Sequence, residues 1–237
     1  SSYKKKDNSN QYNQLKKINL KKEIKIENIS YTYPGKSNPV IKNFSLNIKK
    51  GEFIGIIGKS GEGKSTILDL IMGLIFPSTG KILIDGKEIN SSIKGWQNNL
   101  GHVSQSTNLL DETIKSNIAF GVPENEIENT KLIEAAKKAQ IFNFISSLQS
   151  NFETEVGERG VTLSGGQIQR IGIARELYRD PEVILLDEST SALDLETERE
   201  FLKCLDKLKG DKTIIFVSHR KSALENCDKI IDLKNYE

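Results

Sequence analysis

Residues 58–66 read GKSGEGKST and fit the pattern G-x-x-x-x-G-K-[ST]. They lie between an apolar stretch at 52–57 and a helical pattern at 64–74, the context in which this pattern is typical of a phosphate-binding loop. Glycines let the backbone wrap closely and aim N–H groups at phosphate oxygens, and the following helix adds the positive end of its dipole. We expect Lys64 to reach the β- and γ-phosphates and Ser65 to offer its hydroxyl to Mg²⁺. A glycine-rich turn that binds nothing is the alternative. The residues expected to contact a nucleotide here are Gly58, Lys59, Ser60, Gly61, Gly63, Lys64, Ser65 and Thr66.

A phosphate-binding loop needs a carboxylate partner that holds the metal, and the stretch VILLDE (183–188) offers two adjacent acids after an apolar run. Mg²⁺ prefers oxygen ligands. We expect Asp187 to hold Mg²⁺ and Glu188 to act as the general base that polarises the attacking water. The alternative is a pair of solvated acids at the end of a strand.

The surrounding patterns predict the elements that position these groups. Alternating apolar residues predict strands at 23–30, 44–48, 52–57 and 81–85. Continuous apolar runs at 183–187 and 212–218 favour strands that are buried on both faces of an at least partly parallel sheet. Helical patterns cover 64–74, 126–147, 165–179 and 195–208, and 87–160 is mainly helical and looped. These patterns together indicate one α/β core with a helical insertion.

Composition narrows the class of protein. The chain has 237 residues, of which 36% are hydrophobic and 28% charged. Its formal net charge of +2 is not what we expect of a nucleic-acid binder. The two cysteines have no metal-ligand spacing, and no apolar stretch approaches the length of a transmembrane helix. Residues 1–22 are a lysine-rich lead-in, predicted to be a disordered linker or a basic segment that leaves a membrane surface. Its basic residues are Lys4, Lys5, Lys6, Lys16, Lys17, Lys21 and Lys22.

The stretch LSGGQIQR (163–170), together with the phosphate loop and LLDE, resembles the nucleotide-binding domains of ABC ATPases. Further motifs follow the order of that family. YTYPG (31–35) is similar to the loop that stacks on adenine, GHVSQ (101–105) to the Q-loop, SALD (191–194) to the D-loop and VSHR (217–220) to the switch-histidine segment. The resemblance covers residues 23 to about 233. It implies a P-loop NTPase core with a mixed sheet, antiparallel strands near the N-terminus, and a helical subdomain at about 106–179 that carries the signature, all within an ATPase domain at 23–237.

The signature offers a second anion site. SGGQ is expected to open a helix, so that Ser164 and the amides of Gly165 and Gly166, with Gln167, would meet a phosphate at a helix N-terminus. One chain would then carry two phosphate-binding helix starts. The family implies a head-to-tail dimer, in which each ATP lies between the phosphate loop of one copy and the signature of the other.

The resemblance also assigns roles to single residues. It places Tyr33 on adenine, with Tyr31 as the alternative, Asp194 at the dimer seam and His219 at the γ-phosphate, and it implies ATP and Mg²⁺ as ligands. Gln105 would approach Mg²⁺ and the attacking water and couple the site to a partner domain. Taken alone, Tyr33 could instead be a turn residue. His219, at the end of an apolar strand, could instead be a buried histidine whose hydrogen bonds are satisfied within the fold. Gln97 is also available, but only Gln105 follows the strand-like LGHVS. We interpret His102, inside that strand pattern, as structural.

Two stretches favour an exporter-type or flippase-type domain. EVGERG (155–160) resembles the segment of exporters that contacts the membrane domain, and we expect coupling through 154–160 and the Gln105 region. The pattern T-I-x-x-N-I, which follows the Q-loop, is also similar to the corresponding segment of exporters. The chain opens without Met, as in a fragment of a longer protein, and the lead-in would then link it to a membrane domain at the cytoplasmic face of a bacterial inner membrane. A stand-alone importer ATPase and a soluble ABC protein remain as alternatives.

Overall fold

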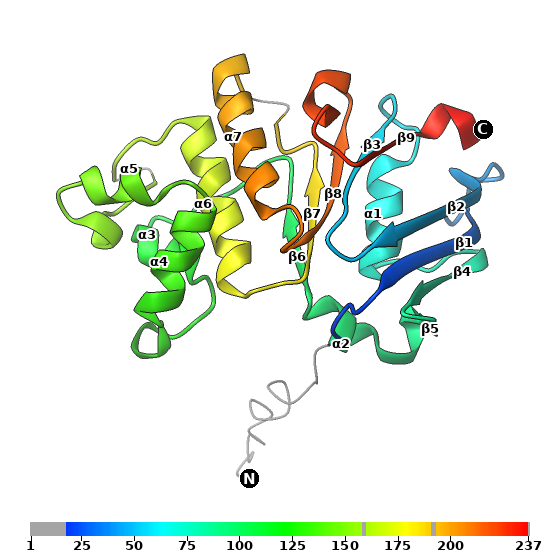
Figure 1. Cartoon of the computed structure of the whole chain (residues 1–237), viewed down its shortest axis with the longest axis horizontal. Coiled ribbons are helices and arrows are strands. Elements are labelled where there is room, and N and C mark those ends of the chain that lie inside the picture. Colours follow the sequence, from blue (N-terminus) through cyan, green and yellow to red (C-terminus); the bar gives the residue numbers. More distant parts are fainter. Residues whose placement is uncertain (1–17, 158–159, 191–192, 237) are drawn as a thin grey trace, which may run out of the picture.

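The structure is a computed structural model that describes residues 18–157, 160–190 and 193–236. It contains two sheets, and each has a single type of pairing (Figure 1). The antiparallel sheet has the order β2-β1-β4-β5, and the parallel sheet has the order β6-β7-β8-β3-β9. The strands are β1 (Glu23–Tyr31), β2 (Ile41–Lys49), β3 (Phe53–Ile57), β4 (Thr79–Ile84), β5 (Lys87–Glu88), β6 (Leu100–Val103), β7 (Val183–Asp187), β8 (Thr213–Ser218) and β9 (Lys229–Asp232). The expected α/β class with antiparallel strands near the N-terminus is confirmed.

Seven α-helices accompany these strands within the described residues: α1 (Lys64–Met72), α2 (Ile93–Gln97), α3 (Ile114–Ile118), α4 (Asn129–Lys138), α5 (Phe142–Ser147), α6 (Gly165–Tyr178) and α7 (Leu195–Leu208). The region 126–147, expected to be helical, is divided into two helices, because α4 ends before Gln140, whose φ of 56° a helix cannot continue through. Helix α1 stops short of 74 because Gly73 caps it with a φ of 65°. The looped region before 160 also contributes the short strands β5 and β6.

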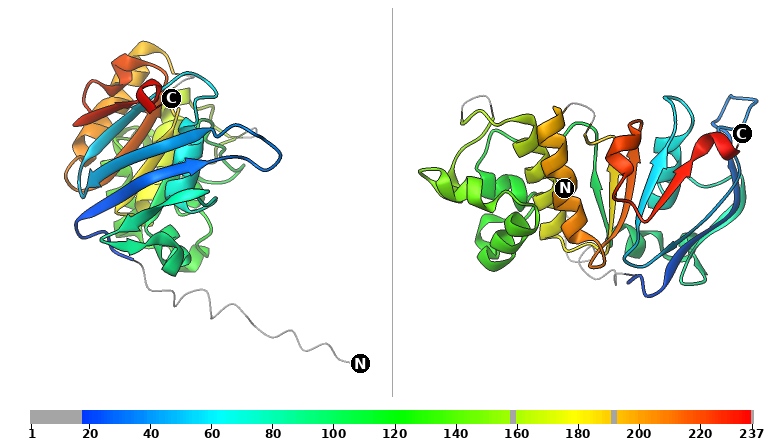
Figure 2. Two further views of the ribbon diagram at one scale, coloured as in Figure 1. Left: turned by 90° about the vertical axis from the view of Figure 1, so that its right-hand side faces the viewer. Right: turned by 45° about the horizontal axis from the view of Figure 1, so that its top comes forward.

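The parallel strands separate two hydrophobic cores. Alternate residues of β7 point to opposite faces, so Leu185 joins the core around α1 and the antiparallel sheet, whereas Ile184 and Leu186 join the core around α6 and α7. Figure 1 shows α1 between the two sheets and α6 and α7 on the far side of the parallel sheet. The antiparallel sheet faces the viewer on the left of Figure 2. Both faces of β7 and β8 are therefore covered, as their continuous apolar sequences predicted.

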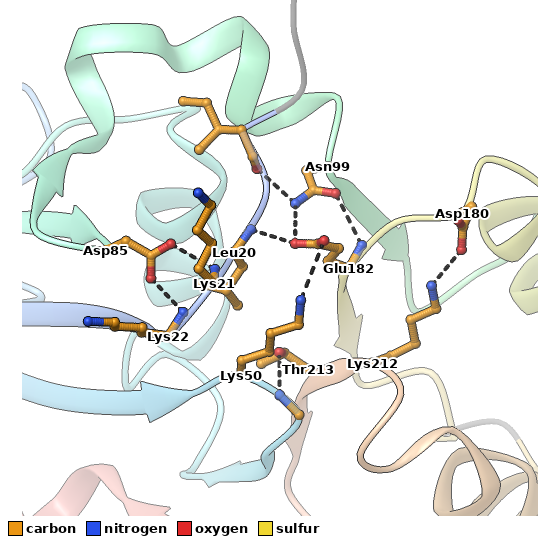
Figure 3. Close-up of polar contacts among 12 residues, drawn as sticks. Leu20, Lys21, Lys22, Lys50, Asp85, Asn99, Asp180, Glu182, Lys212 and Thr213 are labelled. Atoms are coloured by element: carbon orange, nitrogen blue, oxygen red, sulfur yellow. Dashed lines mark hydrogen bonds and ion pairs between the residues drawn. The ribbon is translucent and has the colours of Figure 1, made fainter.

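The described part of the lead-in is anchored to the domain (Figure 3). Leu20 is fully buried, and its backbone N–H donates to the Glu182 carboxylate, which also accepts from the Asn99 amide and lies 3.6 Å from Lys50 Nζ. The carboxylate of Asp85 accepts the backbone N–H groups of residues 21, 22 and 23. Part of the segment expected as a linker thus contacts residues that lie next to the ends of strands of both sheets, while residues 1–17 lie outside the described residues.

Candidate nucleotide-binding site

The glycine-rich loop joins the end of β3 to the start of α1, as its sequence context predicted. Gly61 and Gly63 have φ values of 85° and 88°, a region that L side chains rarely adopt. A Cβ on Gly63 would also lie 2.5 Å from Ile41 Cδ1, so a side chain there would displace this residue of β2. The loop thereby brings Lys64 back over its own backbone, and the Lys64 ammonium donates to the Lys59 carbonyl at 2.9 Å.

Lys64 also meets the acid that follows β7. Its Nζ lies 3.1 Å from Glu188 Oε1, and the lysine side chain is only 5% exposed. Glu188 has a φ of 46°, a strained backbone for a residue with a side chain, of the kind that clusters at functional sites. On its other side, His219 Nδ1 lies 3.7 Å from Glu188 Oε2. Two predicted catalytic residues, Lys64 and His219, therefore converge from separate segments on the carboxylate of a third, Glu188.

Asp187, the last residue of β7, fits the expected metal site. Its Oδ1 is buried and has no hydrogen-bond partner among the described residues. Burial, and then the negative charge of Asp187, raise the pKa of the Asp69 carboxyl on α1. A buried carboxylate oxygen without a hydrogen-bond partner is a suitable ligand for Mg²⁺, because this hard cation takes oxygen ligands. The negative charge of Asp187, which also acts on Asp69, would favour the cation. The Ser65 hydroxyl, on the exposed side of the helix start, lines the same cavity.

The cavity has a volume of about 350 Å³ and gathers most of the residues expected in one site. Its lining comprises Tyr33, Val40, Ser60, Gly61, Gly63, Lys64, Ser65, Thr66, Gln105, Asp187 and Glu188. Of the two tyrosines, Tyr33 is exposed and its hydroxyl lies 3.0 Å from Thr66 Oγ1, whereas Tyr31 is buried beneath it in an edge-to-face contact. Gln97 does not line the cavity, and its side-chain amide donates to the Met72 carbonyl. His102 lies on β6 as expected, but it is exposed.

The signature residues do not line this cavity. Ser164 caps α6: its hydroxyl accepts from the Gln167 N–H, and the Gln167 side chain accepts from the Ser164 N–H. The helix start is therefore preorganised by this capping box. Gly166 is required by a close approach, since a Cβ there would lie 2.0 Å from Thr197 Cγ2 on α7. Figure 1 shows the starts of α6 and α7 at the same upper edge as the loop before α1, with the parallel strands between α6 and α1.

Asp194, expected at the dimer seam, caps the start of α7. Its carboxylate accepts the N–H groups of Glu196 and Thr197 and the Thr197 hydroxyl. The backbone N–H and then the hydroxyl of Thr197 hold the pKa of this carboxyl below its ordinary value. Residues 191 and 192 of the SALD motif and residues 158 and 159 of EVGERG lie outside the described residues.

Sequence reasoning missed two contributors to the site. Glu62 occupies a variable position of the loop motif, yet its carboxylate accepts the Lys59 N–H at 2.6 Å and so occupies one of the amides expected to meet phosphate. Val40 lines the cavity from the loop before β2. The acid within the motif was a usable signal for Glu62, whereas nothing in the sequence distinguishes Val40 from other apolar residues.

A glycine-rich loop between a parallel strand and a helix, facing carboxylates at the end of a strand of the same sheet, defines a P-loop nucleotide-binding domain. The family model described as ABC transporter matches residues 41–191. The chain belongs to the ABC transporter family and corresponds to its ATP-binding domain. Among the described residues, none of the helices has the length and apolar character needed to cross a membrane.

Curated relatives and a solved structure agree with this assignment. The chain is 41% identical over 224 residues to the putative multidrug export ATP-binding/permease protein YgaD of Bacillus subtilis, covering 94% of the chain and 38% of the relative. It is 42% identical to ABC transporter B family member 21 of Arabidopsis thaliana, covering 92% and 17%. The structure of a bacterial Atm1-family ABC exporter with ATP bound matches with a TM-score of 0.79 and 34% identity, covering 93% of this chain and 39% of that one. The chain thus spans about two fifths or less of the length of these proteins.

Proposed function

We propose that this chain is the Mg²⁺-dependent ATPase domain of an ABC exporter, and that it works as a head-to-tail dimer. The observation that carries the proposal is the division of the phosphate-binding groups: the loop, Asp187 and Glu188 line one cavity, while the capped start of α6 lies outside it. A second copy related by a two-fold axis would supply the missing signature to each nucleotide.

In this mechanism the adenine stacks on Tyr33, and the loop amides together with Lys64 bind the phosphates. Asp187, Ser65 and Gln105 would hold Mg²⁺, which when bound neutralises charge on the phosphate oxygens. Phosphate binding draws Lys64 from Glu188, whose carboxylate then orients the attacking water and accepts its proton. His219, 3.7 Å from that carboxylate, is positioned to contact the γ-phosphate. Nearly all of the catalytic effect comes from positioning and charge stabilisation.

Support for transport comes from the relatives, which are export ATP-binding/permease proteins and an ABC exporter. A transmembrane partner domain, on the same or another chain, would contact the Gln105 region and residues 154–160 at the cytoplasmic face of a membrane. ATP-driven closure of the dimer would then be transmitted to that domain, and hydrolysis would reopen it. The transported molecule is recognised in the partner domain.

The test uses the trapped dimer. Glu188→Gln keeps the size and hydrogen bonding of the side chain but removes the base, so ATP with Mg²⁺ should shift this variant to a dimer in size-exclusion chromatography. Adding Ser164→Arg should return the protein to a monomer that still binds ATP, because the serine would serve the partner's nucleotide. Glu134→Gln, an exposed substitution on α4, is the matched control and should hydrolyse ATP at the wild-type rate.

Two results would contradict the proposal. One is a Glu188→Gln variant with wild-type turnover, which would remove the base assignment. The other is a double variant that still dimerises with ATP, which would mean that the signature does not close the partner's site.

A further inference from the structure

One face of α6 holds the loop that carries Gln105. Gln169, Gly172 and Arg175 are spaced three residues apart on this helix, so that they follow each other along one side. All three contact residues 105–108, which follow β6. The same helix begins with the signature, and Gln169 lies only about 6 Å along the axis from Gly165.

Gln169 makes the contact nearest to the site. It is buried, with 5% exposed, although it is polar. Its side-chain amide donates to the Gln105 carbonyl at 3.2 Å, and its side-chain oxygen accepts from the Thr107 hydroxyl at 3.1 Å. The Gln169 side chain therefore fixes the backbone of Gln105, a residue that lines the cavity. Replacing Gln169 by an apolar residue would leave the Gln105 carbonyl and the Thr107 hydroxyl without these hydrogen bonds in a partly buried region.

Two further contacts hold the same loop against the same helix. A Cβ on Gly172 would lie 2.8 Å from Thr107, so the glycine admits this side chain into close contact. The Arg175 guanidinium donates to the Asn108 carbonyl at 3.1 Å and to the Asn117 carbonyl at 2.8 Å. These groups are fixed on a helix, and the loop is therefore displaced when α6 is displaced.

We infer that Gln169 is a positioning residue that ties Gln105 to the signature helix and thereby couples the two ATP sites of the dimer. This inference rests on the proposed function. In the head-to-tail dimer, the start of α6 serves the nucleotide held by the partner, whereas Gln105 of the same chain lines its own cavity. Engagement of the signature at one site therefore sets the position of Gln105 at the other, through the two hydrogen bonds of Gln169.

The experiment compares Gln169→Met with wild type. Methionine has a similar length but neither donates to the carbonyl nor accepts strongly from the hydroxyl. ATPase rates are measured over a range of ATP concentrations with Mg²⁺, and ADP affinity is measured by fluorescence titration. Gln97→Met is the matched control, because Gln97 also donates to a backbone carbonyl but lies outside the site. Thr107→Val removes one of the two bonds without changing α6.

We expect Gln169→Met to lower kcat about 10- to 100-fold by misplacing Gln105. Its Hill coefficient for ATP should fall from above 1 in wild type to 1, and its ADP affinity should stay within about twofold because the loop around Lys64 is untouched. Thr107→Val should show a smaller change of the same kind, and Gln97→Met none. In the Glu188→Gln background, Gln169→Met should still form the ATP-bound dimer.

The inference is overturned if kcat and the Hill coefficient of Gln169→Met equal those of wild type, or if wild type itself has a Hill coefficient of 1. It is also overturned if ADP affinity falls together with kcat, because Gln169 would then serve only the fold. Failure of the proposed function looks different: Glu188→Gln would form no dimer with ATP, whatever residue stands at 169.

Discussion

The ion pair between Lys64 and Glu188 predicts that removing the Glu188 charge strengthens nucleotide binding even though it stops catalysis. The Lys64 ammonium lies 3.1 Å from the carboxylate and 2.9 Å from the Lys59 carbonyl. A phosphate that binds Lys64 must compete with this carboxylate. Glu188→Gln keeps an oxygen that can accept from Lys64 but removes the competing charge.

The size of the effect follows from the geometry. At 3.1 Å and an effective dielectric constant of about 20, the gross attraction between the two charges is about 5 kcal/mol. Desolvation offsets most of it, and a pair with one partly exposed member contributes a net of about 1 kcal/mol. Since 1.4 kcal/mol corresponds to a factor of ten, the dissociation constant should fall about fivefold.

ADP is the ligand to use, because Lys64 is expected to reach its β-phosphate and no hydrolysis can occur. The dissociation constants of wild type, Glu188→Gln and the control Glu134→Gln are compared by fluorescence titration at low salt. Glu188→Gln should bind ADP about fivefold more tightly than the other two proteins. Equal or weaker binding by Glu188→Gln would refute the view that this carboxylate opposes phosphate binding.

Three further outcomes are expected. Leu20→Ala should destabilise the domain by about 2–5 kcal/mol and lower Tm by about 5–15 °C, because this leucine is fully buried, whereas Leu74→Ala at an exposed position should not; thermal unfolding checks both. Tyr33→Ala should weaken ATP binding by about 1–3 kcal/mol while Tyr33→Phe binds as wild type, and equal affinities of all three proteins would place adenine elsewhere. Burial raises the pKa of the Asp85 carboxyl, but the N–H groups that it accepts outweigh burial and set the pKa below its ordinary 3.8. The stability that this carboxylate contributes is therefore present above that value and lost as the pH falls through the lower, folded-state pKa. Asp85→Asn should be less stable than wild type at neutral pH, with a difference that shrinks below about pH 4 in urea unfolding.

The sequence predicted those parts of the site whose functional groups lie in consecutive residues. GKSGEGKS, VILLD and SGGQ each combine a chemical group with the element that carries it, and their strands and helices are found within a few residues of the expected bounds. The roles of the site residues in binding and catalysis stay predictions. Strand β9 was not predicted because it is short and Ile230 is 40% exposed, so its pattern is weak without its partner β3.

Contacts between distant segments were beyond such reasoning. Gln169 lies 64 positions from Gln105 in the chain, and nothing near either residue indicates that they meet. Leu20 belongs to a polar, lysine-rich stretch, and only the fold places it beside Glu182. A helical period predicted a continuous helical pattern over α4 and α5 because apolar spacing continues across Gln140, where the backbone leaves the helical conformation.

In the proposed mechanism, the partners of Lys59 and Lys64 link nucleotide binding to activation. Glu62 occupies the Lys59 amide and Glu188 occupies Lys64, so two carboxylates stand where phosphate oxygens are expected. In the proposed mechanism, Glu188 does not orient a water while its carboxylate contacts Lys64. A phosphate that binds Lys64 would free this carboxylate for water. The contact that is expected to weaken nucleotide binding would therefore also keep the proposed base from water until a nucleotide binds.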